Sequence, residues 1–163
     1  LIDPCALASS KKLIVFSCYL ECGIKKLISQ GAGFDVYESN PNINEAFDLV
    51  NGYKHKGLEC IFSNPSFEIW FILHYRKAPY GKSAEDVKKI VKDLVKEEEP
   101  EYKETTDIFD ILLDKQDKAF KEAVMLHKTQ AEVHKSVFSH ECNPYTNMFE
   151  FITYIKEVKK DIR

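Results

Sequence analysis

The chain has 163 residues, of which 44% are hydrophobic and 30% are charged, and its formal net charge is −3 at neutral pH. This length suits one domain with its own core, and the composition is that of a soluble globular protein. The net charge excludes a uniformly basic nucleic-acid-binding surface, although it is compatible with a local basic patch. No apolar run is long enough to span a membrane and no signal peptide opens the chain, so we predict one cytoplasmic domain over residues 1–163.

The cysteines form an odd, scattered set: Cys5, Cys18, Cys22, Cys60 and Cys142. In a cytoplasmic protein such a set indicates reduced thiols rather than disulfides. Cys18 and Cys22 are the only close pair, and without a second pair or a nearby histidine they are a weak basis for a zinc site.

The first half of the chain alternates apolar strands with short helices. The expected elements are a strand within 12–19, a helix at 23–30, a strand at 33–38, a helix at 42–50 and a strand at 58–63. This is the βαβ order of a parallel sheet, in which ligands bind beyond the carboxyl ends of the strands. Carboxylates that follow such strand ends are therefore candidate site residues.

A buried helix is expected directly after the strand at 58–63. Asn64 is a good N-cap and Pro65 falls at the first helical position, where its missing N–H costs nothing. The helix that follows is almost entirely apolar, and we predict that Trp70 belongs to the core. Glu68 lies in its first turn, where a carboxylate must be paired, bonded to backbone amides or bound to a cation. Both a capping role and a metal-binding role are open for Glu68.

The second half of the chain reads as helical. Arg76 to Lys82 is a basic turn, and Ser83 to Asp86 is a variant capping box that opens a helix with Val87, Val91 and Val95 on its apolar face. A further helix at 108–113 has two candidate caps, Thr105 and Thr106. A long amphipathic segment follows, which either breaks once near Lys115 or runs on towards Val133, and Asn143-Pro144 is expected to start the last helix.

Three motifs resemble those of the RloB-like proteins. The first is Asn64-Pro-Ser-Phe-Glu-Ile-Trp-Phe-Ile-Leu-His-Tyr75, and the others are Asn40-Pro-Asn-Ile-Asn-Glu-Ala-Phe47 and Asn143-Pro-Tyr-Thr-Asn-Met-Phe149. They occur in the family's order and cover roughly residues 35 to 158. RloB-like proteins are found with bacterial restriction and phage-defence operons and are related to Toprim and OLD-type nucleases.

The resemblance implies a fold and an activity. The fold is α/β, with a small, mostly parallel Toprim-like sheet at 12–75 and a mainly helical C-terminal region at 76–163 packed on it. The activity is that of a nuclease dependent on Mg²⁺ or Mn²⁺, since carboxylate oxygens suit such cations. The metal ligands would be Asp35, Glu38 and Glu68, with Glu21 a more distant candidate. The catalytic residues would be Glu68, Asp35 and His74.

The sequence departs from the Toprim pattern at the strand that should carry two metal-binding carboxylates. Where the Toprim pattern has Asp-x-Asp, this chain has Asp35-Val-Tyr37, so a tyrosine stands at the position of the second carboxylate. The connection from the first strand is also shorter than the fold requires. Either the chain has lost its metal site, or residues are missing from the sequence between Gln30 and Gly33 or after Tyr37. The first explanation makes the chain a catalytically degenerate binding or regulatory subunit that partners a nuclease, an ATPase or another restriction-system component.

Two further features have a functional and a structural interpretation. His74 is either a general base or phosphate partner, or a core histidine with a satisfied ring nitrogen. The turn after it mixes cations with an aromatic side chain, and its candidate contacts to DNA or RNA, including tRNA, are Arg76, Lys77, Tyr80 and Lys82. Otherwise this turn is a solvated surface loop.

Overall fold

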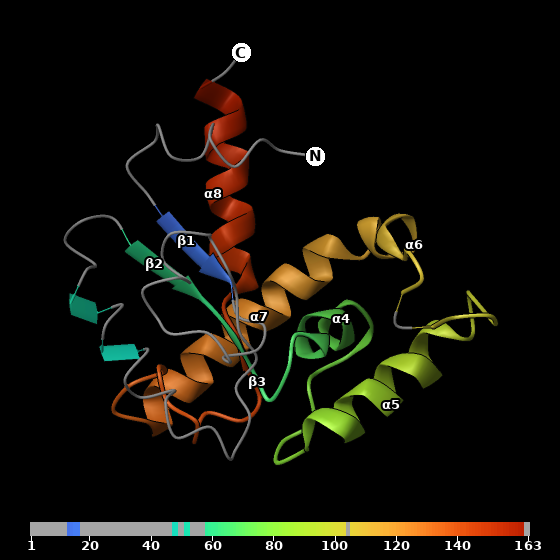
Figure 1. Ribbon diagram of the computed structural model, residues 1–163, viewed down its shortest axis with the longest axis horizontal. Coiled ribbons are helices and arrows are strands. Elements are labelled where there is room, and N and C mark those ends of the chain that lie inside the picture. The colour runs from blue at the N-terminus through green and yellow to red at the C-terminus, as the bar shows by residue number, and fades with distance from the viewer. Residues whose placement is uncertain (1–12, 17–46, 49–50, 53–57, 104, 162–163) are drawn as a thin grey trace.

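The computed structural model describes residues 13–16, 47–48, 51–52, 58–103 and 105–161. In chain order, the elements are β1 (Leu13–Phe16), β2 (Leu58–Ile61), β3 (Ser63–Asn64), α4 (Glu68–Tyr75), α5 (Ala84–Val95), α6 (Phe109–Leu113), α7 (Gln116–Val133), β4 (Tyr145–Thr146) and α8 (Met148–Asp161). Figure 1 shows their arrangement.

The described residues form two small sheets of different kinds. β1 and β2 are parallel, with Leu13 opposite Leu58, whereas β3 and β4 are antiparallel, with Ser63 opposite Thr146. The described part of the chain is therefore mostly helical, and the expected mostly parallel sheet is wrong for it. The difference arises because the chain that continues β2 pairs with a segment from the C-terminal region, which adds an antiparallel partner.

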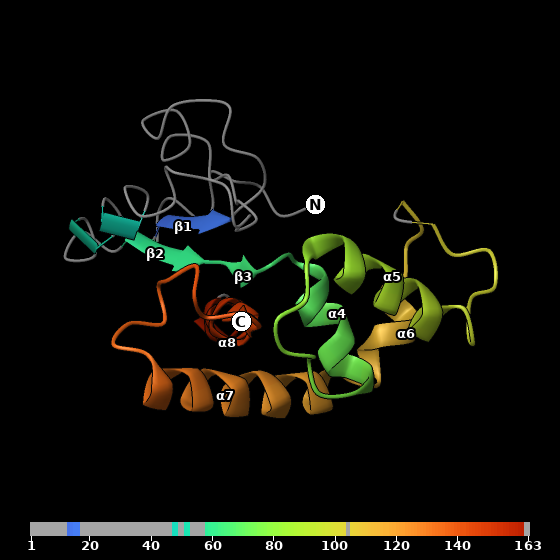
Figure 2. The same ribbon diagram turned by 90° about the horizontal axis from the view of Figure 1, so that it is seen from below.

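The helices build on these strands in layers. Seen from below, α8 lies between the β1–β2 pair and α7, and α4 lies beside α5 (Figure 2). α4 packs on both α5 and α7. The described chain after α4 is thus mainly helical, as expected, and two of its helices pack on α4.

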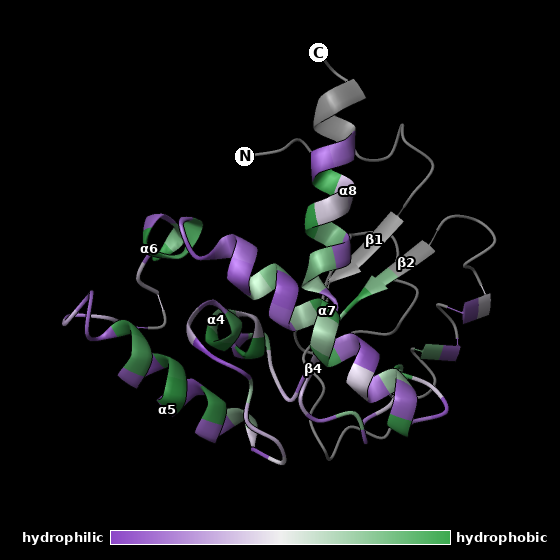
Figure 3. Ribbon diagram, turned by 180° about the vertical axis from the view of Figure 1, so that it is seen from behind, coloured by the Kyte–Doolittle hydropathy of each residue, from purple (hydrophilic) through white to green (hydrophobic). Residues whose placement is uncertain are grey.

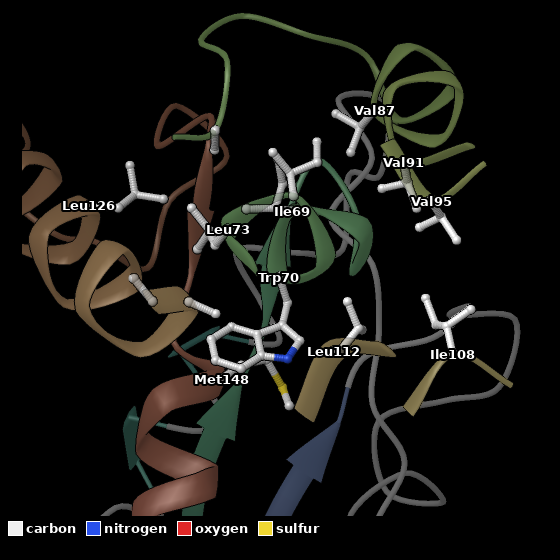
Figure 4. Close-up of a cluster of buried hydrophobic side chains, with 14 of the residues drawn as sticks. Ile69, Trp70, Leu73, Val87, Val91, Val95, Ile108, Leu112, Leu126 and Met148 are labelled. Atoms are coloured by element: carbon white, nitrogen blue, oxygen red, sulfur yellow. The ribbon is translucent and has the colours of Figure 1, made fainter. Parts of the chain in front are cut away.

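The core is centred on α4, as its apolar sequence predicts. Ile69 and Ile72 are fully buried, and Trp70 is 5% exposed. The indole of Trp70 lies beside Met148 and Leu112, so that α4, α6 and α8 meet around it (Figure 4). Trp70 is therefore a core residue, as expected.

α5 is amphipathic and begins where the sequence predicts. The Ser83 hydroxyl accepts a hydrogen bond from the backbone N–H of Asp86 at 3.2 Å, which caps the helix. Val87, Val91 and Val95 are buried. Figure 3 shows this apolar face toward α4, with hydrophilic residues on the other side of the helix. The charged residues of α5 are consequently left at the surface and along its edges.

Several predicted helix boundaries are wrong. α4 begins at Glu68 rather than after Asn64, because Asn64 belongs to β3 and its side chain bonds elsewhere. Asp107, rather than a threonine, accepts the hydrogen bond from the backbone N–H of Phe109 at the start of α6. The sequence left open whether the chain breaks near Lys115, and the structure has the break, since α6 ends at Leu113 and α7 begins at Gln116.

The last motif also begins differently from the prediction. Asn143 and Pro144 precede β4, and α8 begins only at Met148. The helix at 23–30, the strand at 33–38 and most of the helix at 42–50 lie outside the described residues. Within the described part of the chain, no helix is both long and apolar enough to cross a membrane.

Candidate functional site

Glu68 is the first residue of α4 and is partly buried. Its Oε2 atom is buried and has no hydrogen-bond partner among the described residues. Leaving a buried acceptor unsatisfied costs about 1–3 kcal/mol, and a charged group costs more. The capping interpretation required this carboxylate to be satisfied by backbone amides, and no such bond involves Oε2 within the described chain. This oxygen is thus a candidate ligand atom.

Glu68 borders a surface cavity of about 480 Å³ between α4, α5 and the segment that follows α5. Its lining residues are Glu68, Glu85, Lys88, Lys89, Lys92, Tyr102 and Lys103. The volume is within the range of small-molecule and cofactor sites, which is about 300–1,000 Å³.

The cavity combines four lysines with two glutamates. The Lys89 Nζ atom lies 3.9 Å from Oδ1 of Asp86, three residues earlier on α5. Both side chains are exposed, so this ion pair is weak. Within the described residues, neither Lys92 nor Lys103 has an acidic side chain at ion-pair distance. The cavity therefore has an excess of positive charge around a partly buried carboxylate, which suits an anionic ligand.

The sequence did not single out the cavity lysines. The available signal was the spacing of Lys88 and Lys92, which are four residues apart and so share one flank of α5. From the sequence, the position of these lysines around α5 is known only relative to its buried valines. Which neighbouring element this flank borders could not be read from the sequence, because Glu68 precedes Lys88 by twenty residues and a turn.

His74 is buried on α4 and does not line this cavity. Its Nδ1 donates a hydrogen bond to the backbone carbonyl of Trp70 at 2.9 Å, and its ring meets the Trp70 ring edge-on, with the centroids 5.0 Å apart. Burial lowers the pKa of His74 below its ordinary value, although bonds to the backbone oppose this shift. This environment supports the structural interpretation of His74.

The basic turn between α4 and α5 lies apart from the Glu68 cavity. None of Arg76, Lys77, Tyr80 and Lys82 lines that cavity. Lys77 and the exposed Tyr80 instead border a smaller cavity of about 200 Å³, whose other wall includes Met125 and Leu126 of α7. A nucleic-acid contact at this turn stays a prediction.

The other predicted metal ligands cannot be placed. Asp35, Glu38 and Glu21 lie outside the described residues. Within the described ranges, no three His, Cys, Asp or Glu side chains are grouped closely enough to hold a metal ion. Of the carboxylates in the described chain, Glu68 and Glu85 are the two that line the cavity.

A network of buried amides fixes the strand that leads to Glu68. Asn64 donates from Nδ2 to the carbonyls of His140 and Cys142 at 2.9 and 2.8 Å. Asn147 accepts from the Phe62 N–H and donates to the Cys60 carbonyl, both at 2.8 Å. These bonds join the segment around Asn64 to the segment around Asn147, and they hold the backbone immediately before α4.

The comparisons with known proteins agree with the motifs. The family model described as "RloB-like protein" matches residues 34–155, and the chain belongs to this family. No curated protein and no solved structure matches the chain. The matched range contains all three motifs, Glu68 among them, and every residue that lines the 480 Å³ cavity.

Proposed function

We propose that this RloB-like protein acts on nucleic acid as a divalent-metal-dependent nuclease associated with phage defence, with Glu68 as a metal ligand. The single observation that carries the proposal is the buried Oε2 atom of Glu68, which has no hydrogen-bond partner among the described residues and lies beside a lysine-lined cavity. A buried carboxylate oxygen that has no partner in the described part of the chain would be stabilised by a bound cation. Mg²⁺ or Mn²⁺ at this position would polarise a phosphate and activate a water molecule for phosphodiester cleavage.

The chain's own residues would have distinct tasks. Glu68 would hold the cation from the first turn of α4, and Asp35 and Glu38 are proposed as the further ligands that a catalytic site requires. His74 is the weakest of the proposed catalytic residues, because its Nδ1 is bonded to a backbone carbonyl and it borders none of the cavity. An ATPase or another restriction-system component is proposed as the partner protein.

A second candidate is a binding or regulatory subunit without catalysis. The observation that favours it is in the sequence, where Tyr37 replaces the second carboxylate of Asp-x-Asp. Such a protein would keep the fold and the nucleic-acid contact, and its partner would supply the chemistry. The two candidates differ in whether the purified chain cleaves nucleic acid.

The test combines cleavage with metal-dependent stability. The full chain is incubated with DNA and with tRNA in magnesium or manganese, and thermal unfolding is followed with and without manganese. The nuclease proposal expects cleavage that requires metal, and a manganese-induced rise in Tm that is lost in Glu68→Gln. Glu122→Gln is the matched control, because Glu122 is also partly buried but lines the other cavity.

Two outcomes would contradict the proposal. A manganese-induced shift that survives in Glu68→Gln would exclude Glu68 as a metal ligand. Nucleic-acid binding without cleavage in either metal would favour the regulatory subunit.

A further inference from the structure

The cavity between α4 and α5 places four lysines around the carboxylate that is proposed to bind a metal ion. A cation held by Glu68 would experience repulsion from the four lysines around the cavity, although solvent screens it because Lys89, Lys92 and Lys103 are exposed. An anion that contacts the lysines removes this repulsion. The charge balance of the cavity therefore points to a ligand that brings negative charge together with the metal.

Phosphate is the anion that this arrangement fits best. Lysine binds phosphate as a point charge, and a phosphate oxygen can also share a divalent cation with a protein carboxylate. Lys88 and Lys92 lie on one flank of α5, and Lys103 approaches from the segment beyond it. Lysines at the edge of α5 and on a separate segment can contact phosphates that are linked to one another.

We propose that this cavity binds linked phosphates, and that Lys92 and Lys103 are positioning residues for them. The proposal rests on the proposed function, in that the phosphates are expected to belong to a nucleic-acid strand that reaches the Glu68 carboxylate. It assigns the phosphate contact to α5 and the segment after it, rather than to the turn that contains Lys77 and Lys82.

The choice of Lys92 and Lys103 follows from their exposure and their lack of acidic partners in the described chain. Both side chains are exposed, so they can reach a ligand without refolding. Lys103 uses its backbone N–H, and not its side chain, to bond the Thr106 hydroxyl at 2.9 Å. Neutralising either side chain should therefore leave the fold intact.

The experiment compares two double variants that lose the same charge. Lys92→Gln with Lys103→Gln removes two cavity lysines, and Lys77→Gln with Lys82→Gln removes two lysines of the turn. Binding of a fluorescent single-stranded 12-mer is measured in EDTA over a range of salt concentrations, so that cleavage does not interfere. Tripolyphosphate is measured separately as a probe for free linked phosphates.

The cavity variant is expected to bind the 12-mer roughly tenfold more weakly. The slope of the logarithm of its binding constant against the logarithm of salt concentration should be shallower by about 1.4, because two phosphate contacts to a single strand are lost. The turn variant is expected to bind within about twofold of the parent. Equal binding by the cavity variant and the parent would overturn the proposal, as would a loss confined to the turn variant. Failure of the parent to bind either ligand would also overturn it.

The two probes separate the sources of the phosphate. Lysine-dependent binding of the 12-mer supports a nucleic-acid strand. Lysine-dependent binding of tripolyphosphate alone supports the linked-phosphate site and overturns the nucleic-acid source in favour of a free nucleotide. Failure here remains distinguishable from failure of the proposed function, since the latter shows as a manganese response independent of Glu68 or as absence of cleavage.

Discussion

Two polar residues of the first motif, Asn64 and Glu68, lie four residues apart and are treated in opposite ways by the fold. The strand side is β3, where Asn64 is 1% exposed and its amide donates hydrogen bonds to two backbone carbonyls of the segment before β4. The cavity side is the start of α4, where a buried oxygen of Glu68 has no partner in the described chain. A satisfied amide specifies the structure, whereas an unsatisfied carboxylate is a cost that a ligand can remove.

The largest expected effect comes from Trp70, which is 5% exposed in the core where α4, the helix that begins at Glu68, meets α6 and α8. Trp70→Ala should lower the free energy of unfolding by about 3–5 kcal/mol, because it leaves a large cavity among α4, α6 and α8. Urea denaturation measures the loss. Phe109→Ala, which changes a residue that is 62% exposed, should stay within about 0.5 kcal/mol of the parent. A loss below about 1 kcal/mol for Trp70→Ala would mean that Trp70 is not enclosed in this core.

The strand side can be tested by exchanging one atom of Asn64. In Asn64→Asp, an oxygen replaces the nitrogen that donates to two carbonyls, so both acceptors lose their donor and face a carboxylate instead. We expect a loss of about 2–4 kcal/mol in urea denaturation at neutral pH. The control is Asn143→Asp, at a more exposed asparagine that donates to the Lys82 carbonyl at 3.0 Å. Equal losses in both variants would show that the burial of Asn64 is not decisive.

His74 is a buried titratable residue whose ring Nδ1 is hydrogen-bonded to a backbone carbonyl, as the Asn64 amide is. Burial lowers the pKa of His74 below its ordinary value of 6.5, so the unfolded chain binds a proton at a higher pH than the folded chain does. The stability that His74 contributes is therefore complete above pH 6.5 and is lost as the pH falls through the pKa of the folded protein. The slope should reach at most about 1.4 kcal/mol per pH unit.

Unfolding in urea between pH 5 and pH 8 checks this dependence. The slope below pH 6.5 should be reduced in His74→Gln and unchanged in His140→Gln, because His140 is exposed. If the two variants have the same slope, His74 does not control the acid side of the stability profile.

The smallest effect is expected at Glu68 when no metal is present. Glu68→Gln keeps the size of the side chain and has two opposing effects. It loses the interaction of the charge with the start of α4, about 0.3–1 kcal/mol, and it relieves the cost of a buried charged oxygen that has no partner in the described chain, so we expect a net change within about 1 kcal/mol in either direction. Differential scanning calorimetry in EDTA measures the change. A loss above about 2 kcal/mol would indicate a structural partner for the carboxylate and would remove the contrast with Asn64.

The sequence by itself determined the local features of the chain. The Ser83 cap, the valine face of α5 and the burial of Trp70 all follow from propensity and periodicity over a few residues. The motifs also determined the family, which the match over residues 34–155 confirms. These features depend on contacts between residues that are close together in the chain or on a run of residue types.

Only the tertiary structure decided the roles of the polar motif residues. Asn64 reads as a helix cap in the sequence, but it bonds carbonyls 76 and 78 residues away. The pairing of β3 with β4 also joins distant segments, so no local pattern announced an antiparallel partner. The same reason explains why the lysines beside Glu68 were missed and those of the nearby turn were chosen. Helix periodicity gives the face of α5 that turns inward, but the packing of α5 on α4 decides which carboxylate its lysines meet.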